Sequence, residues 1–262
     1  MTGLTATLAA GNFANGNGDL TYIITGTPSS SGTASFAINI GGQACTITRN
    51  VVTDLPPINT QTDCTGTILP LATSGNRNFT VNGKSVTATF SNANTVSVRN
   101  AGAARTCDGG HIGTQSLNIM SEYEATLLGG KDKYGNSIYN YPSSARIKIK
   151  FSTPITNFKV FHTGMHNDEK YTYTFKKNGV TVHPTMKLVC SSYGNHYYII
   201  SSNTVSSNLN DHNTDVYGTY VIGGAWFDEV EINATQSGGR SDNYSALQPH
   251  GSLATFCVGD VQ

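Results

Sequence analysis

The chain has 262 residues, 16 basic and 16 acidic side chains and zero formal net charge, and charged residues make up only 12% of it. This balance excludes the basic stripe with which proteins hold a phosphate backbone, so we expect no nucleic-acid partner, and the 13 tyrosines and 10 phenylalanines favour a folded chain over a disordered one. No apolar stretch approaches the roughly 20 residues of a membrane-spanning helix, and we expect no transmembrane segment.

The first 52 residues contain short stretches in which apolar and polar side chains alternate, separated by turn-like segments rich in glycine, asparagine and serine. Alternation with a period of two predicts strands at the spacing of a β-sandwich. A domain of this size buries a marginal core, so residues upstream or the segment that follows must complete it. We expect the natural chain to extend upstream, because Met1 leads directly into the first predicted strand. The residues that share a face are Leu4, Ala6 and Leu8, then Leu20, Tyr22 and Ile24, then Phe36, Ile38 and Ile40.

The segment 3–51 also contains the blocks GNFANGNG and GTPSSSGTASFAINIGGQ. On these blocks it resembles a module that is repeated in large secreted surface proteins of Bacteroidota-type bacteria. The resemblance implies an Ig-like β module that serves as a stalk in adhesin-like proteins. It implies no catalytic residue, because the motif of the module is structural.

Residues 53–62 (TDLPPINTQT) are predicted to form a linker, because Pro56 and Pro57 cannot continue a strand ladder and stiffen the joint. They separate the small domain over 1–52 from a larger domain that we predict over 63–262. The larger domain contains about ten stretches with strand patterning, which is typical of a jelly roll or a similar sandwich. Its final segments, AWFDEVEI and FCVGDVQ, resemble the end of jelly-roll carbohydrate-binding modules.

Two hairpins and one helix are predicted within the larger domain. Asn82-Gly83 and Asn178-Gly179 each lie between alternating apolar stretches, which predicts tight turns. Residues 145–151 alternate between apolar and basic, which predicts a strand with one solvated face. The helix would begin at a capping box formed by Ser121 and Glu124 and would end at the glycine pair Gly129-Gly130. The predicted fold is therefore all-β with at most one short helix: an Ig-like β module followed by a jelly-roll-like sandwich.

The five cysteines contain no CxxC pair, so a structural zinc site is not expected. The odd number leaves at least one of them free. Cys45 shares strand parity with apolar neighbours, which predicts a buried thiol. The other four can form two disulfides in an oxidising compartment. Of the three pairings we select Cys64–Cys107 with Cys190–Cys257.

The segment 208–217 (NLNDHNTDVY) concentrates carboxylate and amide side chains within a few residues. Ca²⁺ takes about six to eight oxygen ligands, so this density predicts a Ca²⁺ or sugar site, although the pattern of an EF-hand is absent. An Asx-rich turn, whose side chains cap their own backbone, is the open alternative. The candidates are Asn208, Asn210, Asp211, Asn213 and Asp215, of which Asp211 and Asp215 would bind the metal.

Six further polar positions follow predicted strands or lie within them. His166, Asn167, Asp168 and Glu169 follow a strand and form either a ligand-binding loop or a solvated hairpin tip. Asp228 has the parity of the apolar residues in its strand, so its inward carboxylate must bind a metal or accept backbone N–H groups. Asp260 raises the same two alternatives.

Two segments concentrate tyrosines. Exposed aromatic faces stack on the apolar faces of sugars, so these side chains predict a sugar-binding platform. The open alternative is that they cover an edge of the sandwich or pack against the other domain. They are Tyr134, Tyr139 and Tyr141 in KYGNSIYNYP, and Tyr193, Tyr197 and Tyr198 in the second segment.

The sequence contains no nucleophile elbow, phosphate-binding loop or zinc-protease helix. We therefore predict a non-enzymatic fragment of an extracellular bacterial surface adhesin, whose larger domain binds a glycan or glycoprotein on a cell or matrix surface with the help of Ca²⁺. One alternative is a stalk or fibre subunit whose partner is a second copy of itself, since open strand edges pair with other chains. The other is a glycan-active hydrolase, which needs two carboxylates facing each other across a cleft.

Overall fold

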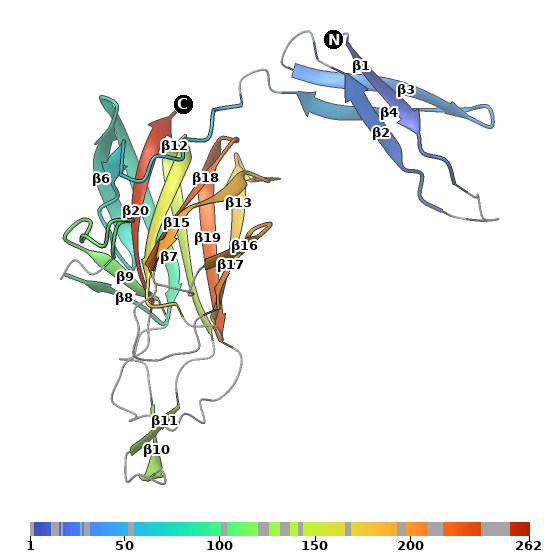
Figure 1. Ribbon diagram of the computed structural model, residues 1–262. Coiled ribbons are helices and arrows are strands. Elements are labelled where there is room, and N and C mark those ends of the chain that lie inside the picture. Colours follow the sequence, from blue (N-terminus) through green and yellow to red (C-terminus); the bar gives the residue numbers. More distant parts are fainter. Residues whose placement is uncertain are drawn as a thin grey trace. The chain divides into compact units, whose positions relative to one another are not determined.

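The computed structural model describes residues 3–11, 16, 18–26, 28, 32–51, 55–100, 104–119, 126–131, 137–140, 144–165, 169–192, 198–208, 217–236 and 252–262. Every regular element among these residues is a β-strand, which confirms the predicted all-β class. The chain divides into two compact units, Met1–Leu55 and Pro56–Gln262, and the division falls within the segment predicted as a linker. Figure 1 shows the strands of each unit. In the described ranges no helix is long and apolar enough to cross a membrane.

The first unit contains two antiparallel hairpins. Strand β1 (Leu4–Leu8) pairs with β2 (Tyr22–Gly26), and β3 (Gly32–Ile40) pairs with β4 (Gln43–Val51). Along β1 and the start of β2, half-buried side chains alternate with exposed ones, as the sequence pattern predicts. The apolar side chains therefore gather on one side of each ribbon.

Cys45 faces the same side of its hairpin as Ile38, its partner across the ribbon, so its predicted strand parity is right. Its side chain is nevertheless exposed, and the prediction of a buried thiol is wrong. Within the described residues β4 pairs only with β3, and Cys45 lies close to the turn at Gly41-Gly42. Ile38 is buried while Cys45 stays exposed, so the cover on this face reaches β3 and not β4 at this position.

The second unit is a β-sandwich whose described strands, apart from one small hairpin, join into a 14-stranded network, because the long strand β12 belongs to both of its sheets. The first sheet contains, in spatial order, β6 (Gly75–Val81), β7 (Lys84–Asn94), the first half of β12 (Ser144–Thr163), β19 (Phe227–Gln236) and β13 (Glu169–Lys177). Beyond β13, both β14 (Val180–Val182) and β17 (Thr204–Ser207) pair with it, and β16 (Tyr198–Ser201) pairs with β17. The second sheet contains β8 (Val96–Arg99), β9 (Ser116–Ile119), β20 (Ser252–Val261), the second half of β12, β18 (Tyr217–Gly223) and β15 (Thr185–Ser192), and β5 (Thr67–Ile68) also pairs with β20.

Strand β12 runs along the first sheet, crosses over, and returns along the second. Up to Phe151 it pairs with β7 and β19, and from Phe158 onward it pairs with β18 and β20. Between these halves Ile155 pairs with both β19 and β20. Its register against β19 shifts between the two halves, where Pro154 cannot donate to a ladder. The rings of Phe151 and Phe158 lie 6.2 Å apart on either side of the crossing. The two sheets are therefore linked at this end by continuous strand.

The helix predicted before Gly129-Gly130 is not present in the described part of that segment. Thr126–Lys131 forms strand β10, which pairs with β11 (Ser137–Asn140). The register shifts between Leu127 and Lys131, so the glycine pair lies at a bulge, where glycine is common, and not after a helix. The capping pair Ser121 and Glu124 lies outside the described residues.

Two predicted Asn-Gly turns and one predicted buried strand face are confirmed, and all three depend only on neighbouring residues. Asn82 and Gly83 have φ of 50° and 80°, and Asn178 and Gly179 have φ of 51° and 79°. Positive φ at both central residues is the signature of the type I′ turns that Asn-Gly predicts. Within 145–151 the apolar side chains are buried between the sheets, as the alternation requires.

Both disulfides use the four predicted cysteines, but the pairing is Cys64–Cys257 and Cys107–Cys190, so the predicted pairing is wrong. Cys257 lies in β20 opposite Ile68 of β5, on the outer face of the second sheet. The segment before β5 crosses that face and brings Cys64 to it. Around this bridge a small buried cluster forms outside the main core; it contains Ala104, Phe161 and Cys257.

The second half of the predicted linker is hydrogen-bonded to the sandwich. Asn157, which has a left-handed φ of 51°, accepts the N–H of Asn59 at 2.9 Å and donates to the carbonyl of Pro57 at 3.0 Å. Lys159 is buried, and its Nζ donates to the carbonyls of Gln61, at 2.6 Å, and Asp63. Burial lowers the pKa of Lys159, while the nearby charge of Asp63 acts in the opposite direction. These contacts make residues 57–63 part of the second unit.

Candidate functional site

The structure describes few of the residues that the sequence nominates for ligand binding. Tyr139 lies in β11. Glu169 is buried at the start of β13, so its placement in an exposed loop is wrong. The nominated residues that lie outside the described residues are Tyr134, Tyr141, His166, Asn167, Asp168, Tyr193, Tyr197, Asn210, Asp211, Asn213 and Asp215. Their contribution to binding stays a prediction.

The strand ends that flank these nominated residues lie at one end of the sandwich, opposite the crossing of β12 (Figure 1). On the first sheet Glu169 pairs with Gln236, and on the second sheet Thr163 pairs with both Tyr217 and Leu253. The segments that start and finish at this end are 166–168, 193–197, 209–216 and 237–251. Residues nominated from separate stretches of sequence are therefore anchored at the same end.

A buried hydrogen-bond network around His162 lies beneath this end. The Nε2 atom of His162 lies 2.6 Å from the hydroxyl of Ser252, which also bonds the hydroxyl of Tyr171, and Nδ1 lies 3.3 Å from the hydroxyl of Tyr220. Tyr198 donates its hydroxyl to the carbonyl of His162 at 3.0 Å. Burial lowers the pKa of His162 to about 3, so the ring is neutral at neutral pH. All of these side chains are buried, and the network joins strands β12, β13, β16, β18 and β20 near this end of the sandwich.

This network corrects one aromatic prediction. Tyr198, nominated for an exposed sugar platform, is buried against the His162 ring, with ring centroids 5.7 Å apart. Burial also raises the pKa of the Tyr171 and Tyr220 hydroxyls, which therefore remain protonated hydrogen-bonding groups. Tyr198 contributes to the core and not to a binding surface.

The two carboxylates predicted to point inward from strands accept hydrogen bonds from protein groups. Asp228 is buried, and its Oδ2 accepts the backbone N–H of Asn178 at 2.8 Å in the turn between β13 and β14. Asp260 accepts from the side-chain amide of Asn157 at 2.7 Å. Across the ranges that the structure describes, no group of three or more His, Cys, Asp or Glu side chains could hold a metal ion. Asp228 thus accepts a backbone N–H, as one of its two alternatives predicts, and its role as a metal ligand stays a prediction.

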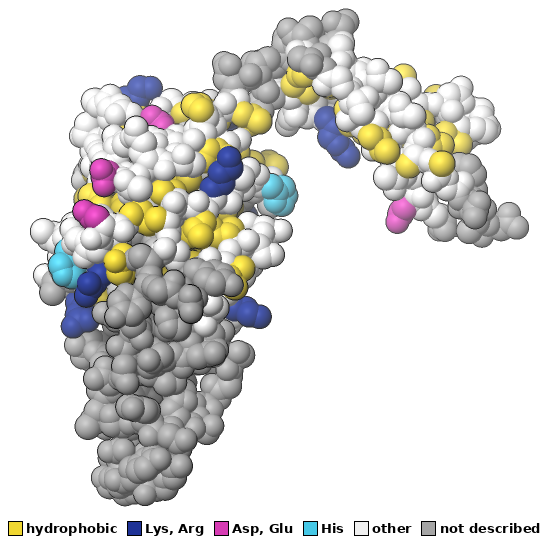
Figure 2. All heavy atoms as spheres, viewed as in Figure 1, with side chains coloured by type: hydrophobic (Ala, Val, Ile, Leu, Met, Phe, Trp, Pro, Cys, Tyr) yellow, Lys and Arg dark blue, Asp and Glu magenta, His cyan; other side chains and the backbone are white. Residues whose placement is uncertain are grey.

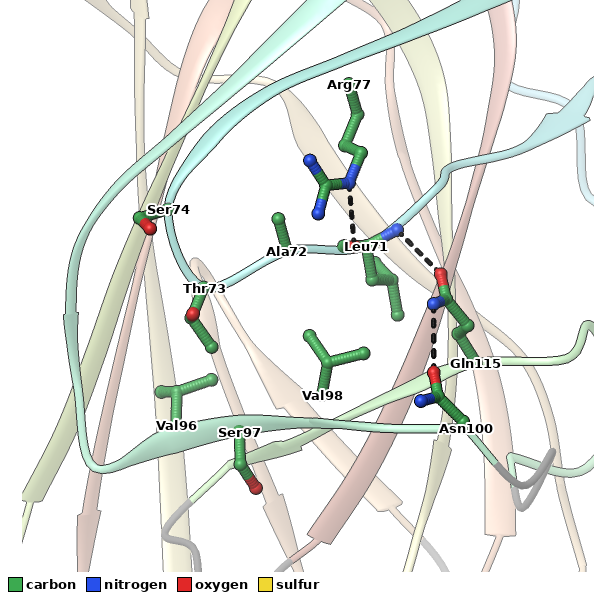
Figure 3. Close-up of a pocket in the computed structure, with 10 residues that line it drawn as sticks. All are labelled: Leu71, Ala72, Thr73, Ser74, Arg77, Val96, Ser97, Val98, Asn100 and Gln115. Carbon is green, nitrogen blue, oxygen red and sulfur yellow. Dashed lines mark hydrogen bonds between the residues drawn. The ribbon is translucent and has the colours of Figure 1, made fainter.

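A groove of about 640 Å³ lies at the side of the sandwich, between edge strands β6 of the first sheet and β8 of the second. The segment that leads from β5 to β6 forms one wall (Figure 3). The lining residues are Leu71, Ala72, Thr73, Ser74 and Arg77 from this segment and β6, Val96, Ser97 and Val98 from β8, and Asn100 and Gln115. All ten belong to the described residues.

Side-chain hydrogen bonds hold the wall of the groove in place. Gln115 donates through Nε2 to Asn100 Oδ1 at 3.1 Å and accepts the N–H of Leu71 at 3.2 Å (Figure 3). Arg77 donates through Nε to the carbonyl of Leu71 at 3.2 Å and through Nη1 to the carbonyl of Asn76 at 2.9 Å. Because lining side chains bind both the N–H and the carbonyl of Leu71, the groove is formed without a ligand.

The lining of the groove is mostly polar and includes two partly buried valines. Val96 and Val98 pack against the main core, and Leu71 is buried in it. The lining carries hydroxyl, amide and guanidinium groups, and none of the described lining residues is acidic. A few directed hydrogen-bonding groups beside a small apolar area can fix the orientation of a small polar ligand.

Sequence reasoning missed this groove, although one signal was present. Arg77 has the strand parity of Phe79 and Val81, whose side chains are buried in the core. A charged residue with inward parity indicates that the core face of the strand opens to solvent at that position. Asn100 and Gln115 come from distant stretches, and no local pattern connects them with Arg77.

A second groove, of about 620 Å³, lies toward the opposite side of the sandwich and is more apolar. It lies between β13 and β15, close to the edge strands β14 and β16. Its apolar lining includes Phe175, Val182, Pro184, Met186 and Ile200. Figure 2 shows charged side chains scattered singly or in small groups over the visible face, without a dominant charged patch.

No protein-family model, curated protein sequence or solved structure matches the chain.

Proposed function

We propose that the second unit binds a glycan in the groove between β6 and β8, as part of a non-enzymatic, extracellular bacterial surface adhesin. The observation that carries this proposal is a mostly polar groove in which hydrogen-bonding side chains lie beside two partly buried valines, Val96 and Val98. A sugar ring presents the complementary surface, with an apolar face and hydroxyls around its edge.

The groove is suited to weak, repeated binding. Polar ligand groups must lose water before they bind, so a single shallow site has low affinity. An adhesin displayed in many copies overcomes this through avidity, because linked sites bind a surface together. The resemblance of 3–51 to a stalk module supports this arrangement, with the first unit as a spacer.

The two disulfides support an extracellular location. Disulfides form and persist in oxidising compartments and are rare in the reducing cytosol. The bridges join the outer segments around Cys64 and Cys107 to the second sheet. They would protect a protein exposed at a cell surface against local unfolding.

The loop-bearing end of the sandwich is the second part of the proposal. Asp211, Asp215 and the nominated tyrosines would extend a glycoprotein contact there, with Ca²⁺ as the cation that the carboxylates suit. Ligand-binding residues often lie on loops that a rigid scaffold positions, and the His162 network provides such a scaffold.

The test is a glycan array with the full chain, run with Ca²⁺ and again with a chelator. Asn100→Ala removes a lining amide and should weaken glycan binding roughly fivefold, the value of about one hydrogen bond. The matched control is Asn78→Ala, which removes an exposed amide of β6 that does not line the groove. Equal binding by both variants would exclude the groove, and loss of binding only in Asp211→Ala with Asp215→Ala would place the site in the loops.

A second candidate function is self-assembly into a stalk or fibre. Val180 in edge strand β14 is 68% exposed, and Ile199 in edge strand β16 is 42% exposed. Apolar side chains on open strand edges favour pairing with another chain. Size-exclusion chromatography over a concentration series tests this function, and Val180→Lys should abolish any oligomer that forms through β14. A monomer at every concentration would contradict it.

A further inference from the structure

The charge of the groove limits the ligands that it can prefer. Arg77 is the only ionisable side chain among its ten described lining residues, so these residues give the groove one positive charge and no carboxylate. The full chain has zero formal net charge, and its described residues form ion pairs elsewhere, for example between Lys148 and Glu229 at 3.4 Å. Among the described residues Arg77 forms no ion pair, and its guanidinium donates to backbone carbonyls.

Arg77 is exposed on edge strand β6, where two hydrogen bonds hold its guanidinium and leave further donors to offer. Its bonds to Leu71 and Asn76 use two of its five N–H groups. A guanidinium that is already held in position loses little conformational freedom on binding, and its planar donors match a carboxylate. The hydroxyls of Thr73 and Ser74 line the same wall and can bond the neighbouring hydroxyls of a sugar (Figure 3).

We infer that the preferred ligand of the groove is a sugar that bears a carboxylate, bound through Arg77 with its ring against Val96 and Val98. This inference rests on the proposed glycan binding and adds its chemical class. The carboxylate can belong to a sialic acid or to a uronic acid, which present the same anionic group on different ring scaffolds.

Isothermal titration of the full chain with matched pairs of sugars tests the inference. The pairs are 3′-sialyllactose against lactose, and a galacturonic acid trimer against its uncharged methyl ester. At least one acid should bind about tenfold more tightly than its neutral partner, in line with one charge-assisted hydrogen-bond pair. The pair that shows the preference identifies which source of carboxylate the groove accepts.

The matched variants are Arg77→Gln and Arg99→Gln, which remove the same charge. Arg77→Gln keeps a donor for the Leu71 carbonyl, and should lower the ratio of acidic to neutral affinity from about tenfold toward one. Arg99 is exposed on β8 and does not line the groove, so Arg99→Gln should keep the full ratio. Raising the salt concentration should weaken the binding of the acid and leave the neutral sugar unaffected.

The possible failures are distinguishable. Equal affinity for acidic and neutral sugars in the unmodified chain would overturn the carboxylate inference and leave glycan binding standing. A preference that Arg99→Gln lowers as much as Arg77→Gln would also overturn it, because the effect would then come from overall charge. Absence of binding to all four sugars would overturn the inference and count against the proposed function.

Discussion

The Cys64–Cys257 bridge makes the largest predicted single contribution to the stability of the second unit. It spans 193 residues, of which the inner Cys107–Cys190 bridge already closes 83, so it closes a loop of about 110 residues. In the chain-entropy description a loop of this length stabilises the folded state by about 5 kcal/mol. Cys257 is also buried beside Phe161, so alanine at this position leaves a small cavity that costs about 1 kcal/mol more.

The double variant Cys64→Ala with Cys257→Ala should therefore lose about 4 to 6 kcal/mol of unfolding free energy. Urea denaturation followed by tryptophan fluorescence measures this, because the single tryptophan, Trp226, belongs to the second unit. With a urea slope of about 2 kcal/mol/M the midpoint should fall by about 2 to 3 M. The control Cys45→Ala removes the exposed free thiol and should leave the midpoint unchanged. A shift of less than about 0.5 M in the double variant would refute the assignment of this bridge as a major source of stability.

Three further perturbations test the core and the turns. His162 stays neutral in the folded chain, whereas in the unfolded chain it binds a proton below a pKa of about 6.5, so the free energy of unfolding should fall by about 1.4 kcal/mol per pH unit as the pH falls from about 6.5 toward 3. His162→Gln should flatten that slope, and parallel urea profiles of variant and native chain would contradict the reasoning. Asp228→Ala leaves the N–H of Asn178 without its acceptor and should cost about 1 to 2 kcal/mol of unfolding free energy, while Asp228→Asn keeps an acceptor and should cost less. A thermal-shift series with and without Ca²⁺ checks both variants. A Ca²⁺ response that only the native carboxylate shows would favour a metal role. Gly66→Ala would place a Cβ 1.9 Å from the carbonyl of Val258, so β5 should detach, and an unchanged melting temperature would count against the close contact between β5 and β20.

The features that the sequence predicts best are those that neighbouring residues determine. The Asn82-Gly83 and Asn178-Gly179 turns depend on the φ preferences of two adjacent residues, and the buried face of 145–151 depends on strand parity. The same parity places Cys45 on the right face, but burial also requires other parts of the chain to cover that face. Parity alone therefore predicted the direction of a side chain and not its exposure.

The features that the sequence does not predict depend on contacts between distant segments. The disulfide pairing follows from how the segment before β5 crosses the second sheet, which brings Cys64 to Cys257 across 193 residues. The groove is similar, because Arg77, Asn100 and Gln115 meet only when the edge strands of two sheets are in place. Inward parity of Arg77 was the one local sign of it.

The measurement that tests the central claim most directly is an NMR titration of the isotope-labelled full chain with the strongest-binding glycan of the array. If the groove is the site, the largest amide shifts should map to Leu71, Arg77, Asn100 and Gln115, with small shifts elsewhere in the sandwich. Shifts confined to the segments 166–168, 193–197 and 209–216 would contradict this account and place glycan binding at the loop-bearing end.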